Sequence, residues 1–246
     1  MFQNFSRSLA DLAGEDYCNY VCAASAALTG ESEAALRLLA HEQVAFCPPA
    51  FFARQEALIS RTGEQIAPAM ERTESGAASD SYRVAQHNAQ SPLAGYGAFR
   101  VGEDGRLYFA AKSEHYHIPL RHSFPGYRLL EIAKRLGIPN ATHNNTRGYL
   151  TRTTERRLIA GANGVSPDDA RMSEILSSRE PGVLNRVIKL ETGSLAVEAA
   201  IKVARNWHRA HGRGQRTKII TREVAYHGTT MGALTATGLT DLKVPF

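Results

Sequence analysis

The chain between residues 187 and 211 combines a short apolar run, a glycine turn and an amphipathic segment. Residues 187–190 (Val-Ile-Lys-Leu) predict a buried strand, and the turn at Gly193 leads into a helix that Gly212 can close. One face of this helix is apolar and contains Val197, Ala200, Ile201, Ala204 and Trp207 or His208. The opposite face holds Glu198 and Lys202, an acid-before-base pair at a spacing that supports a helix. Together these features predict a strand–turn–helix unit of an α/β protein.

The turn at the start of this helix has two interpretations. The first backbone N–H groups of a helix lack partners within it, so Gly193 and Ser194 can bind a phosphate there. The hydroxyl groups of Thr192 and Ser194 can add donors. Alternatively, Thr192 only caps the helix, because Ser and Thr are favoured at that position in any protein.

A second segment has the same organisation. Residues 217–221 (Thr-Lys-Ile-Ile-Thr) predict another buried strand, and Tyr226, His227 and Gly228 follow it before a new helical run. Ligands of open α/β sheets bind beyond the carboxyl ends of the strands. We therefore expect both turns to face the same crevice.

These two segments resemble a known family. Residues 191–207 (Glu-Thr-Gly-Ser-Leu-Ala-Val-Glu-Ala-Ala-Ile-Lys-Val-Ala-Arg-Asn-Trp) and 225–234 (Ala-Tyr-His-Gly-Thr-Thr-Met-Gly-Ala-Leu) are similar to motifs of class III aminotransferases. The resemblance implies an α/β fold of type I, with pyridoxal 5'-phosphate as cofactor. It also implies transfer of an amino group from an amino acid or amine to a 2-oxo acid, by a homodimer.

The resemblance also implies a set of cofactor-binding residues, namely Thr192, Gly193, Ser194, Tyr226, His227 and Gly228. The first three match the phosphate turn. Tyr226 matches the aromatic residue that stacks on the pyridine ring, and the two residues after it complete that wall. Without the resemblance, Tyr226 would be an ordinary half-buried tyrosine at the end of a strand.

The family's Schiff-base lysine and the acidic partner of the pyridine nitrogen come well after the Tyr-His-Gly motif. The lysines of this chain are Lys112, Lys134, Lys189, Lys202, Lys218 and Lys243, and none stands in the matching context. We therefore expect no catalytic residue in this chain, which would be the N-terminal portion of an aminotransferase and inactive alone. The alternative is a non-catalytic phosphate-binding or assembly module derived from the same fold.

The rest of the chain predicts a division into four parts. These are an N-terminal helical segment at 1–72, a linker at 73–97, a small-domain segment at 98–184 and the start of a truncated, cofactor-binding mixed-sheet domain at 185–246. We expect helices at 31–46, 51–59 and 127–136, and one that Ser166 caps. Residues 99–101 and 107–109 flank a Glu-Asp-Gly turn and predict a hairpin.

Charge and hydrophobicity indicate whether the chain binds nucleic acids or membranes. The net charge of +5 invites a nucleic-acid partner, but the basic residues are scattered among acids and no nucleic-acid motif accompanies them. No apolar run approaches the ~20 residues that span a bilayer, and the N-terminus lacks the apolar core of a secretory signal. We expect neither a nucleic-acid nor a membrane partner.

The cysteines and histidines indicate packing and surface roles. Three cysteines, Cys18, Cys22 and Cys47, favour a reducing cytoplasm over a disulfide framework. Cys18 and Cys22 lie one helical turn apart, which packing explains better than a metal. His115 and His117 lack a partner at ligand spacing, so we expect surface histidines and no metal site.

Overall fold

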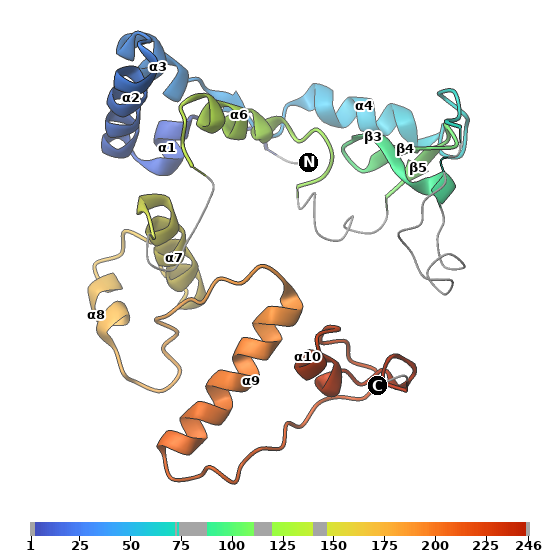
Figure 1. The fold of residues 1–246 in the computed structure, drawn as a ribbon. Helices are drawn as coiled ribbons and strands as arrows, with labels where there is room; N and C mark the ends of the chain where they lie inside the picture. Colours follow the sequence, from blue (N-terminus) through green and yellow to red (C-terminus); the bar gives the residue numbers. More distant parts are fainter. Residues whose placement is uncertain (1–2, 72, 74–87, 111–119, 140–146, 245–246) are drawn as a thin grey trace. The chain divides into compact units, whose positions relative to one another are not determined.

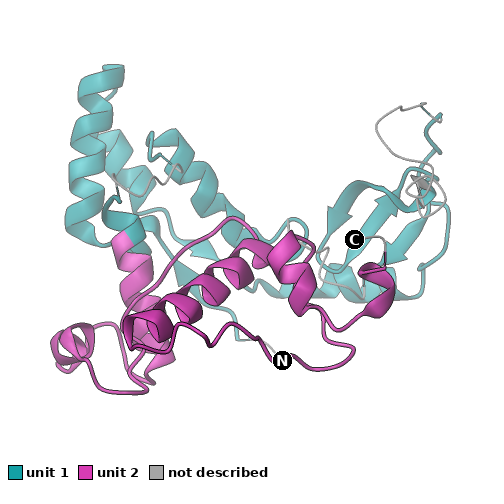
Figure 2. Ribbon diagram, turned by 60° about the horizontal axis from the view of Figure 1, so that its bottom comes forward, with its two compact units in different colours: residues 1–151 teal, residues 152–246 magenta. Residues whose placement is uncertain are grey.

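A computed structural model describes residues 3–71, 73, 88–110, 120–139 and 147–244 of this chain (Figure 1). The chain divides into two compact units, residues 1–151 and 152–246 (Figure 2). Each unit has its own packing and is described by itself. Short antiparallel sheets and helices occur together, so the structure is mixed α and β.

The first unit contains a small helical core. Its helices are α1 (Leu9–Ala13), α2 (Glu15–Thr29), α3 (Glu33–Ala40) and α6 (Arg128–Arg135), which the 3-10 turn η2 (Pro125–Tyr127) precedes. Cys18 and Cys22 are 1% and 0% exposed and pack with Leu36 and Ile132. The packing role expected for both cysteines is confirmed, and the helix expected at 127–136 is present as η2 and α6.

The helix expected at 31–46 ends at Ala40, so this prediction was wrong for residues 41–46. Strand β2 (Val44–Ala45) instead pairs antiparallel with β1 (Ser6–Arg7). This pairing gives the backbone inter-strand hydrogen bonds and buries Val44 in the helical core. A partner nearly forty residues away therefore overrides the local helical pattern.

The first unit also contains a helix and a three-stranded sheet. Helix α4 (Pro49–Ile59) confirms the helix expected at 51–59. Strands β3 (Pro92–Tyr96), β4 (Phe99–Gly102) and β5 (Leu107–Phe109) pair antiparallel in that order, and β4 and β5 are the expected hairpin. Strand β3 and the 3-10 turn η1 (Asn88–Gln90) lie in the range expected to be a linker, whose residues 74–87 are outside the described part.

The second unit is helical. It contains most of α7 (Tyr149–Ala162), with α8 (Met172–Ser177), α9 (Gly193–Ala210), α10 (Met231–Ala236) and the 3-10 turn η3 (Thr240–Leu242). Its buried core comprises Ile159, Ala160 and Met172. Ser166 does not cap a helix, contrary to expectation. The Ser166 carbonyl accepts a hydrogen bond from Asp169 N at 3.0 Å, so Ser166 begins a turn instead of a helix. The next helix starts at Met172.

The two strands expected before the family motifs are absent, and these predictions were wrong. Residues 187–190 and 217–221 have no regular secondary structure and belong to no sheet. A strand needs hydrogen bonds from a neighbouring strand, and the described part of this unit offers none. Ile188 is 66% exposed and Ile220 is 97% exposed, so neither segment has the burial that its apolar residues predicted. The type I sheet therefore remains a prediction.

The structure describes no helix that combines the length and the apolar character required to cross a bilayer.

Candidate functional site

Helix α9 begins at the predicted turn. Thr192 has extended backbone torsions, and its Oγ1 accepts a hydrogen bond from Leu195 N at 3.2 Å. The capping interpretation of Thr192 is therefore confirmed. It leaves the N–H groups of Gly193 and Ser194 without an acceptor in the described part of the chain. They lie at the positive end of an 18-residue helix, where an anion is favoured.

The Tyr-His-Gly segment belongs to a closed loop that runs from Val224 to Gly238. Gly238 N donates to Ala225 O at 2.6 Å, and Val224 N donates to Gly238 O at 3.3 Å. Inside the loop, the Oγ1 of Thr237 accepts from His227 N at 3.0 Å. Thr237 is fully buried, so this hydroxyl fixes the backbone at His227, next to Tyr226.

The two motifs are in direct contact. Thr229 N donates to Ser194 Oγ at 3.2 Å. Gly228 has φ of +125°, and a Cβ built on it would lie 2.4 Å from Ser194 Oγ. Only glycine fits this backbone at this distance. The structure thus brings together the two turns that the sequence placed at one site, and Figure 1 shows α10 beside the N-terminal end of α9.

Glu198 has a different partner from the one expected. Its Oε1 accepts from Thr230 Oγ1 at 2.8 Å, from Gly232 N at 2.7 Å and from Ala233 N at 3.2 Å. The Thr230 hydroxyl and then these two N–H groups hold the pKa of the Glu198 carboxyl below its usual range, and the charge of Lys202 contributes less. The sequence contained no sign of this contact, because the helical spacing of Glu198 to Lys202 already explained the carboxylate.

The remaining predicted residues are accessible. Tyr226 is 55% exposed, so its ring is available to a ligand. His227 is half-buried, and its backbone is held by Thr237. A Cβ built on Gly193 would meet nothing within 4 Å, so the space beside the first turn of α9 is open.

A separate basic hollow of about 400 Å³ lies near the other end of α9. It is lined by Ala204, Arg205, His208, Gln215, Arg216, Thr217, Lys218 and Ile219. Burial, and then the charges of Arg213 and Arg216, lower the pKa of His208. At 1.5 Å per residue, His208 is roughly 20 Å along the helix from Gly193, so this hollow is not part of the candidate site.

Within the described ranges, no group of three or more His, Cys, Asp or Glu side chains could hold a metal ion. His115 and His117 lie outside the described residues.

Known proteins share the segment that contains both turns. Residues 160–246 match the aminotransferase class-III family. A probable aminotransferase of Mycobacterium tuberculosis is 44% identical over 81 residues, which are 33% of this chain and 17% of the relative. A taurine–pyruvate aminotransferase of Rhodobacter capsulatus is 43% identical over 79 residues, 32% of this chain and 17% of the relative. An omega-aminotransferase of Caulobacter vibrioides is 35% identical over 71 residues, 29% of this chain and 16% of the relative.

The resemblance to class III aminotransferases, enzymes that generally depend on pyridoxal phosphate, is therefore confirmed over this segment. The matched residues include all of α9 and the loop from Val224 to Gly238. The chain spans less than a fifth of the length of these three relatives.

Proposed function

We propose that this chain contributes the phosphate-binding turn and the ring-stacking wall of a pyridoxal-phosphate-dependent aminotransferase. The reaction would move an amino group from an amino acid or amine to a 2-oxo acid, in a homodimer. One observation carries the proposal: Ser194 and the Gly228–Thr229 backbone are in contact, which unites the two family motifs into one site. A cytoplasmic location remains a prediction from the three cysteines.

The residues at the turn fit a phosphate. Within the described ranges, the N–H groups of Gly193 and Ser194 at the positive end of α9 have no acceptor, and no side chain fills the space beside Gly193. The hydroxyls of Thr192 and Ser194 already accept backbone bonds, but each keeps a hydrogen that it can donate. When bound, the cofactor supplies an electron sink for the carbon that carries the amino group. The exposed ring of Tyr226 would hold it flat.

Variants of the turn test this proposal. Pyridoxal phosphate is titrated into the chain and into Gly193→Val and Ser194→Ala, and binding is followed by visible absorbance and equilibrium dialysis. We expect Gly193→Val to abolish binding, because its side chain would occupy the phosphate space. Ser194→Ala should weaken binding only modestly, since one hydroxyl is lost. Gly214→Val is the matched control, because a Cβ on Gly214 also meets nothing within 4 Å.

Equal affinity of the original chain and Gly193→Val would contradict the phosphate role and leave Thr192 as a cap only. Absence of binding to the original chain would contradict the cofactor proposal itself. Binding of pyridoxal phosphate no tighter than that of inorganic phosphate would instead favour the alternative of a non-catalytic phosphate-binding module.

A further inference from the structure

A single carboxylate joins the two halves of the candidate site. We propose that Glu198 is a positioning residue that holds the Tyr226–Thr230 loop against the first turn of α9. The inference rests on the proposed function, because it assigns Glu198 a role in cofactor binding. Glu198 would not touch the cofactor and would act through the backbone that it fixes.

The contacts of Glu198 are specific. Its Oε1 accepts three hydrogen bonds, from the hydroxyl of Thr230 and the N–H groups of Gly232 and Ala233, at 2.7 to 3.2 Å. A Cβ built on Gly232 would lie 2.3 Å from Glu198 Oε2. A side chain at position 232 would therefore overlap the Glu198 carboxylate in the position that it occupies here. An ion pair with Lys202 on the helix surface would require neither these three hydrogen bonds nor the close approach to Gly232.

Glu198 also takes the place of a local cap. Thr230 is the N-cap residue of α10, but its side chain makes no capping bond and donates to Glu198 instead. Helix α10 has six residues, too few to persist without tertiary contacts. The N–H groups of Gly232 and Ala233, which a cap would satisfy, donate instead to Glu198, 34 and 35 residues away along the chain. The start of α10 therefore depends on α9.

The face of α9 that carries Glu198 also contacts the loop that contains Tyr226. Ser194 lies one helical turn before Glu198, so both side chains point toward the same loop. Ser194 contacts Gly228 and Thr229, and Glu198 contacts the residues just after them. Ser194 alone provides one hydrogen bond of 3.2 Å, whereas Glu198 adds three. Loss of Glu198 should release the loop that carries Tyr226.

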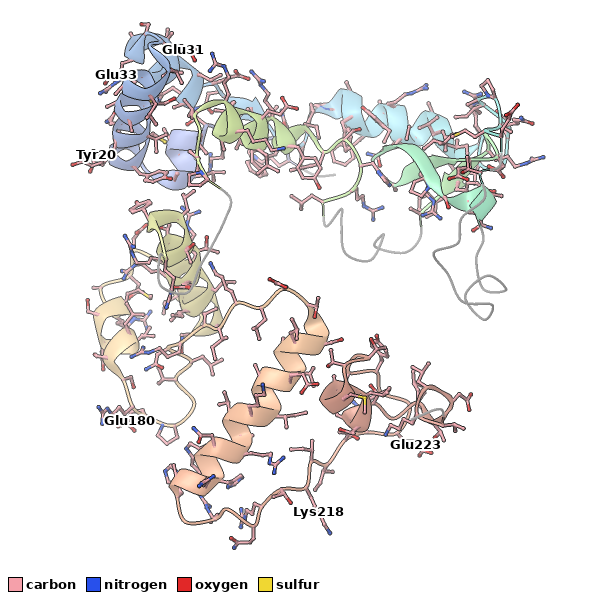
Figure 3. All side chains as sticks on the ribbon, in the orientation of Figure 1. Tyr20, Glu31, Glu33, Glu180, Lys218 and Glu223 are labelled. Atoms are coloured by element: carbon pink, nitrogen blue, oxygen red, sulfur yellow. The ribbon has the colours of Figure 1, made fainter. Side chains whose placement is uncertain are left out.

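The test uses two measurements on the full chain. The variants are Glu198→Ala, Glu198→Gln, which keeps one acceptor oxygen, and Glu198→Asp, which keeps the charge but is one methylene too short. Glu180→Ala is the control, because Glu180 is an exposed carboxylate in the loop after α8 (Figure 3). The first measurement is amide hydrogen exchange at Thr229, Gly232 and Ala233 without cofactor. The second is affinity for pyridoxal phosphate.

We expect Glu198→Ala and Glu198→Asp to lose amide protection at all three positions and to bind pyridoxal phosphate about tenfold or more weakly. Glu198→Gln should retain protection and stay within about threefold of the original affinity. Glu180→Ala should change neither. Rescue by glutamine distinguishes an acceptor that positions the loop from a carboxylate that only supports folding.

Retained protection in Glu198→Ala would overturn the inference, and so would lost protection with unchanged affinity. If Glu198→Ala fails to fold, Glu198→Asp decides by the same criteria. If the original chain does not bind pyridoxal phosphate, the proposed function fails, whereas the amide exchange still shows whether Glu198 holds the loop.

Discussion

The backbone of Gly228 lies against the side chain of Ser194, so closely that a Cβ on Gly228 would stand 2.4 Å from Ser194 Oγ. The two residues come from different motifs, and the hydrogen bond from Thr229 N to Ser194 Oγ fixes their distance. This contact brings the two turns of the candidate site together. It also makes the loop sensitive to changes as small as one methyl group.

Gly228→Ala should destabilise the second unit by about 2 kcal/mol or more. Its φ of +125° is unfavourable for alanine, and the added methyl would overlap Ser194. Urea unfolding of the full chain measures the loss. Gly214→Ala is the control, because its Cβ would meet nothing within 4 Å. Equal midpoints for both variants would show that the loop is not packed on α9.

Thr237→Val should cost about 1 to 3 kcal/mol, although the two side chains have nearly the same shape. The valine would leave His227 N without its acceptor at a buried position. Thr235→Val serves as the control, because Thr235 is exposed and water can replace its bond to Gly232 O. Thermal unfolding of both variants compares them. An unchanged midpoint for Thr237→Val would contradict the role of this hydroxyl in closing the loop.

Asp11 should stabilise α1 in a pH-dependent manner. The Ser8 N–H at 2.8 Å, and then the Gln43 amide at 3.1 Å, hold the pKa of the Asp11 carboxyl below its usual range. A depressed pKa means that the unfolded chain takes up the proton first as the pH falls. The stabilisation is therefore complete above about pH 5 and declines through about pH 4 and below, where the unfolded carboxyl titrates.

The difference in thermal midpoint between the original chain and Asp11→Asn should consequently shrink as the pH falls from 7 to about 3. Asp16→Asn is the control, because Asp16 is exposed and no side-chain bond to it is found in the described residues. A difference that stays constant over this range would refute the proposed linkage.

Thiol reactivity should separate the three cysteines. Burial raises the pKa of the Cys18 thiol to about 11, and it also raises that of Cys22, whereas Cys47 is partly exposed. At pH 8, a thiol reagent should modify Cys47 quickly and the two buried thiols only after unfolding. Cys47→Ser should remove the fast phase. Three equal rates in the folded chain would contradict the packed helical core.

The elements that the sequence predicted correctly are those that local interactions stabilise. Helix α9 follows from an apolar face at helical spacing and from the cap at Thr192. The β4–β5 hairpin follows from the Asp104-Gly105 turn, in which Gly105 has φ of +74°. These signals lie within a few residues of one another, so no distant partner is needed to interpret them.

Apart from the cap expected at Ser166, which a local turn replaces, the incorrect predictions depended on partners far along the chain. Residues 187–190 and 217–221 carry the composition of buried strands, but composition cannot supply a neighbouring strand. The helix expected at 31–46 gave way to pairing of Val44 with Arg7. Hydrophobic and β-branched residues suit several environments, and the available partners select one of them.

Some features of the candidate site likewise follow from local sequence, and others depend on tertiary packing. The sequence by itself determined that a capped helix begins at Gly193 and that a glycine-containing turn follows Tyr226, because helix caps and glycine turns are local chemistry. Only the tertiary structure decided that Ser194 contacts Gly228 and that Glu198 binds the first turn of α10 rather than acting as a surface partner of Lys202. A carboxylate satisfies its hydrogen bonds with whichever donors the fold brings within reach, and that choice depends on the packing of α10 against α9.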